Sequence, residues 1–521
     1  MNSASRYYAN RYQDSVALMK LSAQVMAMPG VELAAVVMAS AGNIDTLAAA
    51  GLGRFEVRPN DIIVVVKGSE AGCAAALERA DALLTAPAES APQEEGSVPL
   101  PITSLHGAVR RDPGHNLALV SVPGDYAAAE AMKALRLGMD VMLFSDNVPP
   151  AAELTLKHYA RRHDLLVMGP DCGTAIINGI PLGFANVVRR GPIGAVGASG
   201  TGLQEVTSRI HRLGSGISQA IGTGGHDLSA EIGGISMLQG LQALTDDPAT
   251  RVIVLVSKPP APAVAEVVLA AAEACSKPVV VIFLGVDPRS LTRQGVHGAS
   301  TLAEAADLAV TLAQGEMPAA APPSIPVELL HRFGALCRSM APTQRHLRAL
   351  FCGGTFCFEA QLLHAAAGIA VASNVSTAGN PQLEQARIGP GHSMVDLGDD
   401  LFTRGRPHPM IDPVLRDSRL LQEADDPTTA VILFDVVLGH GAAADPLTGL
   451  LGAIEQARSR ALAAGRRLLF IAHVCGTDQD PQNRSAVVAA LRAAEVFVAD
   501  SSAEAALWSV AVLRDCLGGA A

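Results

Sequence analysis

The sequence predicts an α/β protein built from several doubly wound domains with parallel sheets, Rossmann-like and flavodoxin-like, and a small ferredoxin-like α/β module at the amino terminus. Short runs rich in Val, Ile and Leu alternate with Ala-rich helical segments, as in parallel sheets covered by helices on both faces. Hydrophobic residues make up 49% of the 521 residues and aromatic residues only 3%, so the cores must be aliphatic. A chain of this length is typical of about three to four domains.

Composition excludes several classes of partner. The formal net charge is −11, and no block of Lys and Arg occurs, so we expect no nucleic acid and no membrane surface as a partner. Every apolar run is interrupted within about a dozen residues, well short of the roughly 20 that span a bilayer. The start of the chain lacks the apolar core of a secretory signal, so we expect a cytoplasmic protein. The eight cysteines form no CxxC pair, and we expect neither a disulfide framework nor a metal.

Two stretches rich in Pro, Ala and acidic residues, 86–101 and 315–327, are expected to be linkers. They leave three segments, and a Gly-Pro turn near residue 191 divides the middle one again. The expected domains are therefore a small α/β module at 1–85, a Rossmann domain at 102–189, a flavodoxin-type domain at 190–314 and a second flavodoxin-type domain at 328–521.

In the first module we expect a helix near 14–28, strands at 31–40 and 61–68, and two further helices. It shows no cluster of polar side chains, which favours an assembly or regulatory role over catalysis. In the later segments the apolar runs predict strands at 116–122, 140–145, 164–170, 193–199, 216–225, 251–257, 278–285, 346–354, 369–374, 393–398, 430–439, 466–476 and 495–501.

A short internal repeat links the two flavodoxin-type segments. After a predicted strand, Gly200 and Thr201 are followed by Glu205 with the spacing G-T-x-x-x-E. Gly354, Thr355 and Glu359 repeat that spacing at the corresponding place. Because both copies lie at a strand-to-helix turn, we expect a duplicated fold.

Glycine-rich turns after strands are the candidate ligand sites, because helix N-termini there offer free N–H groups and a positive dipole end. In the strongest candidate, Gly200 and Gly202 let an anion approach, and Ser199 and Thr201 add hydroxyl groups. The alternative is a tight turn with an ordinary N-cap. Further candidate turns hold Gly439, His440 and Gly441, before a helix expected near Asp445, and Pro170 and Cys172. No Walker A loop occurs anywhere.

Histidines and arginines in irregular segments supply further candidates. His297 lies in a Gly-flanked loop after a predicted strand, where it would serve as nucleophile or general base, or merely cap a helix. His226 follows Gly224 and Gly225, two candidate substrate-binding residues, although the adjacent Asp227 also suggests local turn bonding. Arg404 and Arg406 flank a glycine among helix breakers and suit carboxylate or phosphate binding, or form a solvated loop.

Ordered motifs then indicate a family. The runs 166–173 (LVMGPDCG), 193–205, 221–227 and 277–299 resemble, in this order, motifs of the succinyl-CoA synthetase α-subunit, the last ending near its phosphohistidine loop. The runs 394–398 and 433–441 resemble the carboxyl-terminal domain of the β-subunit. Over its full length the chain looks most like the FdrA proteins, which join these two parts. The resemblance makes 102–189 a CoA-binding-like domain and the two later domains ligase-like.

The resemblance implies a phosphate held between two helix N-termini, one at Ser199 to Thr201 and the other at Gly439 to Gly441. It also implies that His297 is the phosphohistidine and that Glu205 hydrogen-bonds its ring and fixes the tautomer. The histidine loop reads GVHGAS rather than the family's GHAGA. Phosphate is then a substrate of the reaction.

Three functions remain open at this point. The leading one is a subunit of a carbamoyl- or acyl-transferring complex, of the oxamate carbamoyltransferase type associated with FdrA-like proteins in allantoin breakdown. There oxalurate and phosphate give oxamate and carbamoyl phosphate. The second is an acyl-CoA synthetase subunit, although no Gly-rich CoA fingerprint precedes Asn116, so CoA is not a certain cofactor. The third is a scaffold without catalysis. No ATP-grasp segment is present, so partner subunits and an oligomeric complex are expected.

Overall fold

The computed structural model describes residues 2–517 except 14, 86–101, 317–324, 384–388, 390 and 404–406. The chain divides into two compact units, one of Met1–Asp171 with Thr403–Pro407, the other of Cys172–Phe402 with His408–Ala521. The predicted linker at 86–101 and the candidate residues Arg404 and Arg406 lie outside the described residues. In the part that is described, no helix is long and apolar enough to cross a membrane.

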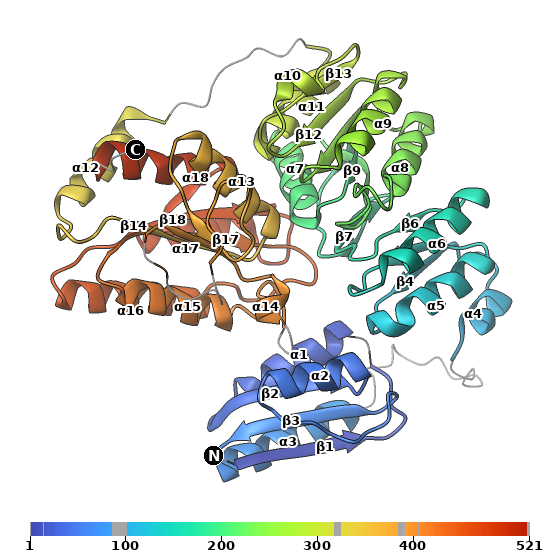
Figure 1. The fold of residues 1–521 in the computed structure, drawn as a ribbon, viewed down its shortest axis with the longest axis horizontal. Helices are drawn as coiled ribbons and strands as arrows, with labels where there is room; N and C mark the ends of the chain where they lie inside the picture. The colour runs from blue at the N-terminus through green and yellow to red at the C-terminus, as the bar shows by residue number, and fades with distance from the viewer. Residues whose placement is uncertain are drawn as a thin grey trace. The chain divides into compact units, whose positions relative to one another are not determined.

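The first unit begins with a small antiparallel sheet of order β1-β3-β2 (Figure 1). Alternate residues of its strands face opposite sides, so Val36 and Val64 join one apolar cluster with α1 and α3, while Ile63 and Val65 join another with α2. The elements are β1 (Asn2–Tyr8), α1 (Ser15–Met26), β2 (Val31–Met38), α2 (Ala41–Ala49), β3 (Ile62–Gly68) and α3 (Glu70–Thr85).

Strand β1 was not predicted from the sequence. Its residues, NSASRYY, are mostly exposed, and the strand pairs on one side only, with β3. A polar edge strand buries too little surface to leave a hydrophobic pattern, which explains why the periodicity missed it.

The first unit also holds a parallel three-stranded sheet of order β4-β5-β6, as expected for a Rossmann-like segment. Ala127, Ala131 and Ala134 of one helix pack beside Val141 and Leu143 of the central strand. Its elements are α4 (Leu105–Arg111), β4 (Leu117–Val120), α5 (Gly124–Arg136), β5 (Asp140–Leu143), α6 (Pro150–Arg162) and β6 (Val167–Met168).

The second unit contains a seven-stranded sheet of order β13-β12-β11-β9-β10-β7-β8 (Figure 1). Strands β9 to β13 are parallel, and the hairpin β7-β8 adds two antiparallel strands at one edge. The sheet thus includes residues before position 190, where the sequence placed a domain boundary. Its elements are β7 (Thr174–Ile177), β8 (Ile180–Gly183), β9 (Arg190–Gly197), α7 (Gly200–Arg212), β10 (Ile217–Gly222), α8 (Ile235–Asp246), β11 (Val252–Ser257), α9 (Pro262–Glu273), β12 (Val279–Phe283), α10 (Pro288–Leu291), β13 (Val296–Gly298) and α11 (Leu302–Gln314).

A six-stranded parallel sheet of order β15-β16-β14-β17-β18-β19 follows in the same unit. Strand β17 is buried along its whole length, as the continuous apolar run at 430–439 predicted. The elements are α12 (Val327–Arg338), β14 (His346–Phe351), α13 (Gly354–Ala366), β15 (Ala372–Ser373), β16 (Ser393–Asp396), α14 (Asp400–Thr403), α15 (Val414–Asp425), β17 (Thr429–Val437), α16 (Thr448–Ala463), β18 (Leu469–Cys475), α17 (Arg484–Ala493), β19 (Phe497–Ala499), α18 (Ser502–Ala511) and a π-helical turn (Val512–Cys516).

The two sheets of the second unit share one topology. Around β9 the order is β10 on one side and β11, β12, β13 on the other, and around β14 it is β16 on one side and β17, β18, β19 on the other. Apart from the hairpin β7-β8 in one sheet and the two-residue strand β15 in the other, both match the flavodoxin-like order, in which ligands bind beyond the carboxyl end of the first strand. The predicted duplication is thus present, and it places the N-termini of α7 and α13 at equivalent points.

Candidate functional site

The candidate site begins at the N-terminus of α7. Ser199 is the N-cap, and its hydroxyl oxygen accepts a hydrogen bond of 3.0 Å from the Gly202 N–H. The Leu203 N–H donates to the Ser199 carbonyl. Among the described residues nothing accepts from the N–H groups of Gly200 and Thr201. Two donors at the positive end of a 13-residue helix are therefore free for an anion.

The N-terminus of α13 is equivalent but is built differently. Its N-cap, Gly353, has no side chain, and the Asp435 carboxylate instead accepts from the N–H groups of Cys352 and Gly353 at 2.7 and 2.8 Å. Within the described residues, the N–H groups of Gly354 and Thr355 have no acceptor. This helix therefore also presents two free donors.

The two helix ends meet. The hydroxyl groups of Ser199 and Thr355 lie 2.6 Å apart and share a hydrogen bond, and a Cβ on Gly353 would lie 3.1 Å from the methyl carbon of Thr201. Two positive dipole ends that converge repel each other unless a negative charge lies between them. The arrangement therefore suits a phosphate-sized anion.

An independent observation also points to a ligand here. Thr174 is 2% exposed, and its hydroxyl has no hydrogen-bond partner. That oxygen lies 3.4 Å from the position a Cβ would take on Gly200, so the hydroxyl is directed at the start of α7. A buried hydroxyl without a partner costs free energy, and a bound anion at this helix end would satisfy it.

Further along α7, Glu205 forms a buried ion pair. Its carboxylate lies 2.8 Å from His473 Nε2 on β18, and the His473 ring meets the Phe356 ring of α13 edge-on, with centroids 5.5 Å apart. Burial alone would raise the pKa of Glu205, but the His473 charge and hydrogen bond, with Arg212, outweigh burial and lower this pKa to about 2. His473 thus joins α7 to α13, behind the two helix ends.

The expectation that Glu205 hydrogen-bonds His297 is wrong. Glu205 pairs with His473 because α7 packs against the second sheet, a contact between segments far apart in sequence.

His297 does not lie in a loop but on the short edge strand β13, paired with Val280. Val280 is in register with Val254, and Val254 with Ala195, so His297 lies three strands from β9 and level with Ala195. With about 4.8 Å between strands and 3.3 Å per residue, His297 is roughly 20 Å from Ser199. Burial lowers the pKa of His297. The structure does not bring this histidine to the helix ends.

The turn at Gly439, His440 and Gly441 does not start a helix, because α16 begins only at Thr448. The Gly439 N–H donates to Gln482, and the His440 N–H donates to the Ala185 carbonyl. The expectation of a helix N-terminus at this turn is therefore wrong, and the helix whose start contacts that of α7 is α13.

The other candidate residues have structural surroundings. The Cys172 thiol donates to the carbonyls of Thr174 and Gly222, which fastens β7 to β10. Gly224 and Gly225 form the turn after β10, and Asp227 accepts from the Ser236 and Met237 N–H groups at the start of α8. Pro170 belongs to the first unit.

Metal binding has one candidate cluster in the described part of the chain, formed by Glu205, His473 and Cys475. Arg212 lies 3.8 Å from Glu205, and Arg484 adds a second positive charge that acts on Glu205 and Cys475. Burial raises the pKa of the Cys475 thiol, and the Glu205 charge raises it further. A neutral thiol and the positive charges of two guanidinium groups that act on this cluster do not suit a cation.

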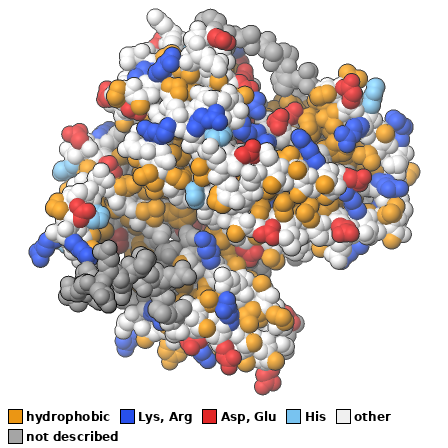
Figure 2. All heavy atoms as spheres, turned by 180° about the vertical axis from the view of Figure 1, so that it is seen from behind, with side chains coloured by type: hydrophobic (Ala, Val, Ile, Leu, Met, Phe, Trp, Pro, Cys, Tyr) orange, Lys and Arg blue, Asp and Glu red, His pale blue; other side chains and the backbone are white. Residues whose placement is uncertain are grey.

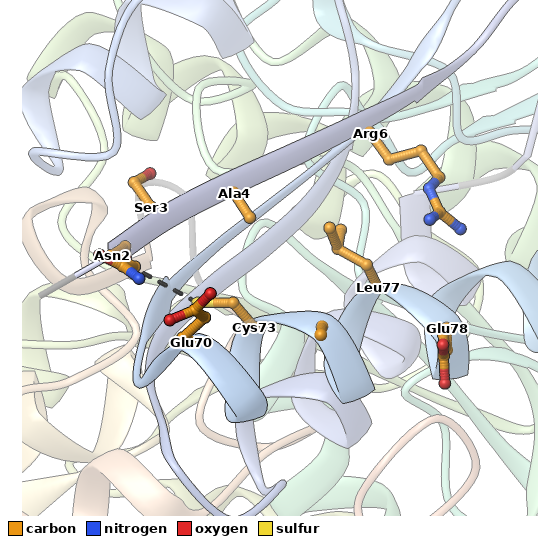
Figure 3. A pocket seen from close by; sticks show the side chains of 9 residues that line it. Asn2, Ser3, Ala4, Arg6, Glu70, Cys73, Leu77 and Glu78 are labelled. Carbon is orange, nitrogen blue, oxygen red and sulfur yellow. Dashed lines mark hydrogen bonds between the residues drawn. The ribbon is translucent and has the colours of Figure 1, made fainter.

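A pocket of about 490 Å³ lies in the first unit, between β1 and α3 (Figure 3). Its charged lining residues are Arg6, Glu70 and Glu78, so it offers no excess of positive charge to an anion. On the face drawn in Figure 2, charged side chains of both signs are interspersed with hydrophobic ones, without a field of one sign.

Comparisons with known proteins indicate the class to which this chain belongs. Residues 350–512 match the family described as CoA-ligase, residues 189–285 match the CoA binding domain, and residues 1–99 match the AllF, heavy metal-associated domain. The CoA binding domain match thus falls on the β9 to β12 region, after the 102–189 segment. These matches define a CoA-ligase-like protein.

The protein YahF of Escherichia coli is 43% identical over 504 residues, which are 96% of each chain. The chain belongs to the FdrA-like family that includes YahF, a fusion of parts that resemble succinyl-CoA synthetase subunits.

More distant relatives match smaller parts of this chain. The succinate–CoA ligase subunit alpha of Staphylococcus epidermidis is 25% identical over 38% of this chain and 66% of its own length, and that of Aquifex aeolicus 25% identical over 30% and 53%. The chain therefore spans less than two thirds of either subunit. A dinucleotide-forming acetyl-coenzyme A synthetase from Ca. Korarchaeum cryptofilum, solved with phosphate and ADP, matches with 16% identity over 77% of this chain and 82% of its own, at a TM-score of 0.29. That value is too low to bear on function.

The heavy metal-associated name does not fit the residues present. Residues 1–99 contain a single cysteine, Cys73, and its thiol is buried and donates to the carbonyls of Asn2 and Val66. One occupied thiol does not provide a metal site.

Proposed function

We propose that this chain is the phosphate-binding subunit of a complex that transfers a carbamoyl or acyl group, with inorganic phosphate as the nucleophile. The convergence of α7 and α13 carries the proposal, because the two helix starts are in contact, each has two N–H groups without an acceptor, and the unpartnered Thr174 hydroxyl lies beside Gly200. Aligned N–H groups hold a dianion without the reorganisation that water would need. Phosphate held there is positioned to attack a carbonyl carbon.

The carbamoyl-transfer reaction that fits best is oxalurate plus phosphate to oxamate plus carbamoyl phosphate. Membership of the FdrA-like family and the AllF domain match support it. The sequence contains no nucleotide-binding loop, and this reaction needs a held phosphate and no ATP. Partner subunits would bind the organic substrate, since the succinate–CoA ligase relatives are alpha subunits of their enzymes.

A second candidate is an acyl-CoA synthetase subunit, favoured by the CoA-ligase and CoA binding domain matches. The start of α5 does not fit the CoA pyrophosphate. A Cβ on Gly124 would lie 2.5 Å from the Asp146 carbonyl oxygen, so the chain itself fills the close approach that this glycine permits. Asp125 places a carboxylate in the first turn. Chemistry that uses CoA would need another site.

The test measures phosphate binding by calorimetry, with Gly200→Val as the key variant. The new side chain fills the space between α7 and Thr174, so we expect a loss of phosphate affinity of at least about tenfold. Gly452→Val is the matched control, because Gly452 has nothing within 4 Å of its Cβ position. Unchanged affinity in Gly200→Val would place the phosphate elsewhere.

The reaction itself is tested with the chains encoded beside this one, assayed for carbamoyl phosphate from oxalurate and phosphate. A CoA requirement would favour the acyl-CoA synthetase candidate. If the complex with the Gly200→Val variant assembles and turns over as fast as the complex with the wild-type chain, this chain is a scaffold.

A further inference from the structure

Three polar side chains, those of Asp396, His408 and Lys258, lie near the start of α13. Asp396 ends β16, and its Oδ1 accepts a 2.9 Å hydrogen bond from the Gly398 N–H. Its Oδ2 lies 2.5 Å from the position that a Cβ would take on Gly354. The carboxyl group is therefore against the first residue of α13, where the proposed phosphate binds.

His408 faces the same place. Its Nδ1 accepts from the Met410 N–H at 3.2 Å, so the neutral ring carries its hydrogen on Nε2. A Cβ on Gly398 would lie 2.5 Å from His408 Nε2 and 3.2 Å from Asp396 Oδ1, so only a glycine fits between these two groups. Burial lowers the pKa of His408 to about 4, which keeps the ring neutral near pH 7.

Charges from several elements act on the Asp396 carboxyl. Lys258, after β11, is the cation, and its ammonium lies 5.8 Å from the centre of the Phe358 ring on α13. Asp399, which follows strand β16, and Asp435, on β17, add negative charge near this carboxyl group. Burial raises the pKa of Asp396 most, Lys258 and the Gly398 hydrogen bond lower it, and the result is about 7. The Cys357 thiol on α13 stays protonated, because burial and the Asp396 charge raise its pKa.

We propose that Asp396 is the proton-transfer group of this site and a catalytic residue for the reaction. This inference rests on the proposed function. Phosphate oxygen forms a bond to the carbonyl carbon, the carbon–nitrogen bond breaks, and Asp396 gives its proton to the departing nitrogen. The carboxylate then takes the proton that hydrogen phosphate brought, so the substrates H–OPO₃²⁻ and R–CO–NH–R′ become R–CO–OPO₃²⁻ and H₂N–R′ with no net proton change.

The charge of Asp396 predicts how the affinity for an anion depends on pH, and this affinity can be measured without catalytic turnover. A carboxylate and a dianion compete for the N-terminus of α13, because both gain from the same dipole end and repel each other. Anion binding therefore favours protonated Asp396, and the anion's affinity must fall where Asp396 ionises.

The experiment measures sulfate binding by calorimetry at pH 6 and pH 8 for the wild type and for Asp396→Asn. Sulfate is the probe because it remains a dianion over this range, whereas phosphate itself titrates. If only the protonated acid permits binding, the wild-type affinity is about tenfold weaker at pH 8 than at pH 6. In Asp396→Asn, whose amide still accepts from Gly398, the affinity is the same at both pH values.

Asp399→Asn is the matched control, since it removes a neighbouring charge but leaves Asp396 to titrate, so the pH dependence persists. If the wild type binds sulfate and Asp396→Asn keeps the tenfold change, the role of Asp396 is overturned while the anion site stands. If the wild type binds neither sulfate nor phosphate, there is no anion site, and the proposed function is overturned together with the role of Asp396. In the reconstituted complex, Asp396→Asn should lower turnover by about 10² or more while sulfate still binds.

Discussion

The starts of α7 and α13 occupy equivalent places in two sheets of the same topology, yet different chemistry holds them. At α7 a neutral hydroxyl, that of Ser199, caps the helix, and the carboxylate of the same helix, Glu205, pairs with His473. At α13 two buried carboxyl groups, Asp435 and Asp396, lie at the helix start. The duplicated fold thus provides one end suited to holding an anion and another suited to handling its proton.

The largest expected effect is a loss of stability when a side chain at the start of α13 is removed. Asp435→Ala removes the acceptor for two buried N–H groups, those of Cys352 and Gly353. Leaving both donors unsatisfied should lower the free energy of unfolding by about 2–4 kcal/mol. Urea denaturation measures it. A loss under about 1 kcal/mol would mean that water replaces the carboxylate and that the α13 turn does not depend on it.

Glu205→Gln tests the carboxylate of the α7 side. The folded pKa of Glu205 is lowered to about 2, so its stabilisation is full above the unfolded value near 4.3 and is lost as the pH falls toward 2. We expect a loss of about 2 kcal/mol at pH 7 that shrinks steadily between pH 5 and pH 2. Denaturation curves at several pH values measure this, and a difference that does not vary with pH would contradict the ion pair.

Ser199→Ala should have a smaller effect. It removes the N-cap of α7 and the hydroxyl that Thr355 contacts, which should cost about 1 kcal/mol of stability. Phosphate affinity should fall a few-fold, because the free N–H groups of Gly200 and Thr201 remain. Ser199→Thr keeps a capping hydroxyl and should restore most of the stability. A Thr variant as impaired as the Ala variant would show that the hydroxyl is not what matters.

The smallest expected effect is that of His297→Ala. His297 is half-buried on an edge strand, roughly 20 Å from Ser199 by strand geometry, and contributes to neither helix end. Phosphate affinity and turnover of the complex should change by less than about twofold. A large loss of turnover with unchanged folding would instead restore the phosphohistidine hypothesis and require a movement of β13.

The apolar strands and the duplicated motif were predictable because each is local. Strands such as β11 and β17 are continuous runs of buried Val, Ile and Leu, and Gly200 and Gly354 each open a helix directly after a strand. The polar edge strand β1 gave no such signal. The short strand β13 was read as a loop for the same reason.

The site was harder to predict because its members come from separate elements. Ser199 and Glu205 are candidates from the sequence alone, but the partners that the structure gives them, Thr355 and His473, lie 156 and 268 residues away in sequence. Thr174, Asp396 and His408 were not marked as site residues, since a threonine on a strand or an aspartate at a strand end has many ordinary roles. The family resemblance placed a helix N-terminus at Gly439 to Gly441, where the structure has none.

The sequence alone determined the class of fold, the two parallel sheets of the second unit and the helix that begins at Gly200, because hydrophobic periodicity and glycine placement act within a few residues. Only the tertiary structure decided which helix ends face each other and which carboxyl groups face them. Those contacts depend on how α7 packs against the second sheet, and side-chain pairing across that interface leaves no periodic trace in the sequence. The same tertiary contacts decide the charge states: His473 and Arg212 lower the pKa of Glu205 against the effect of burial, whereas burial raises the pKa of Asp396.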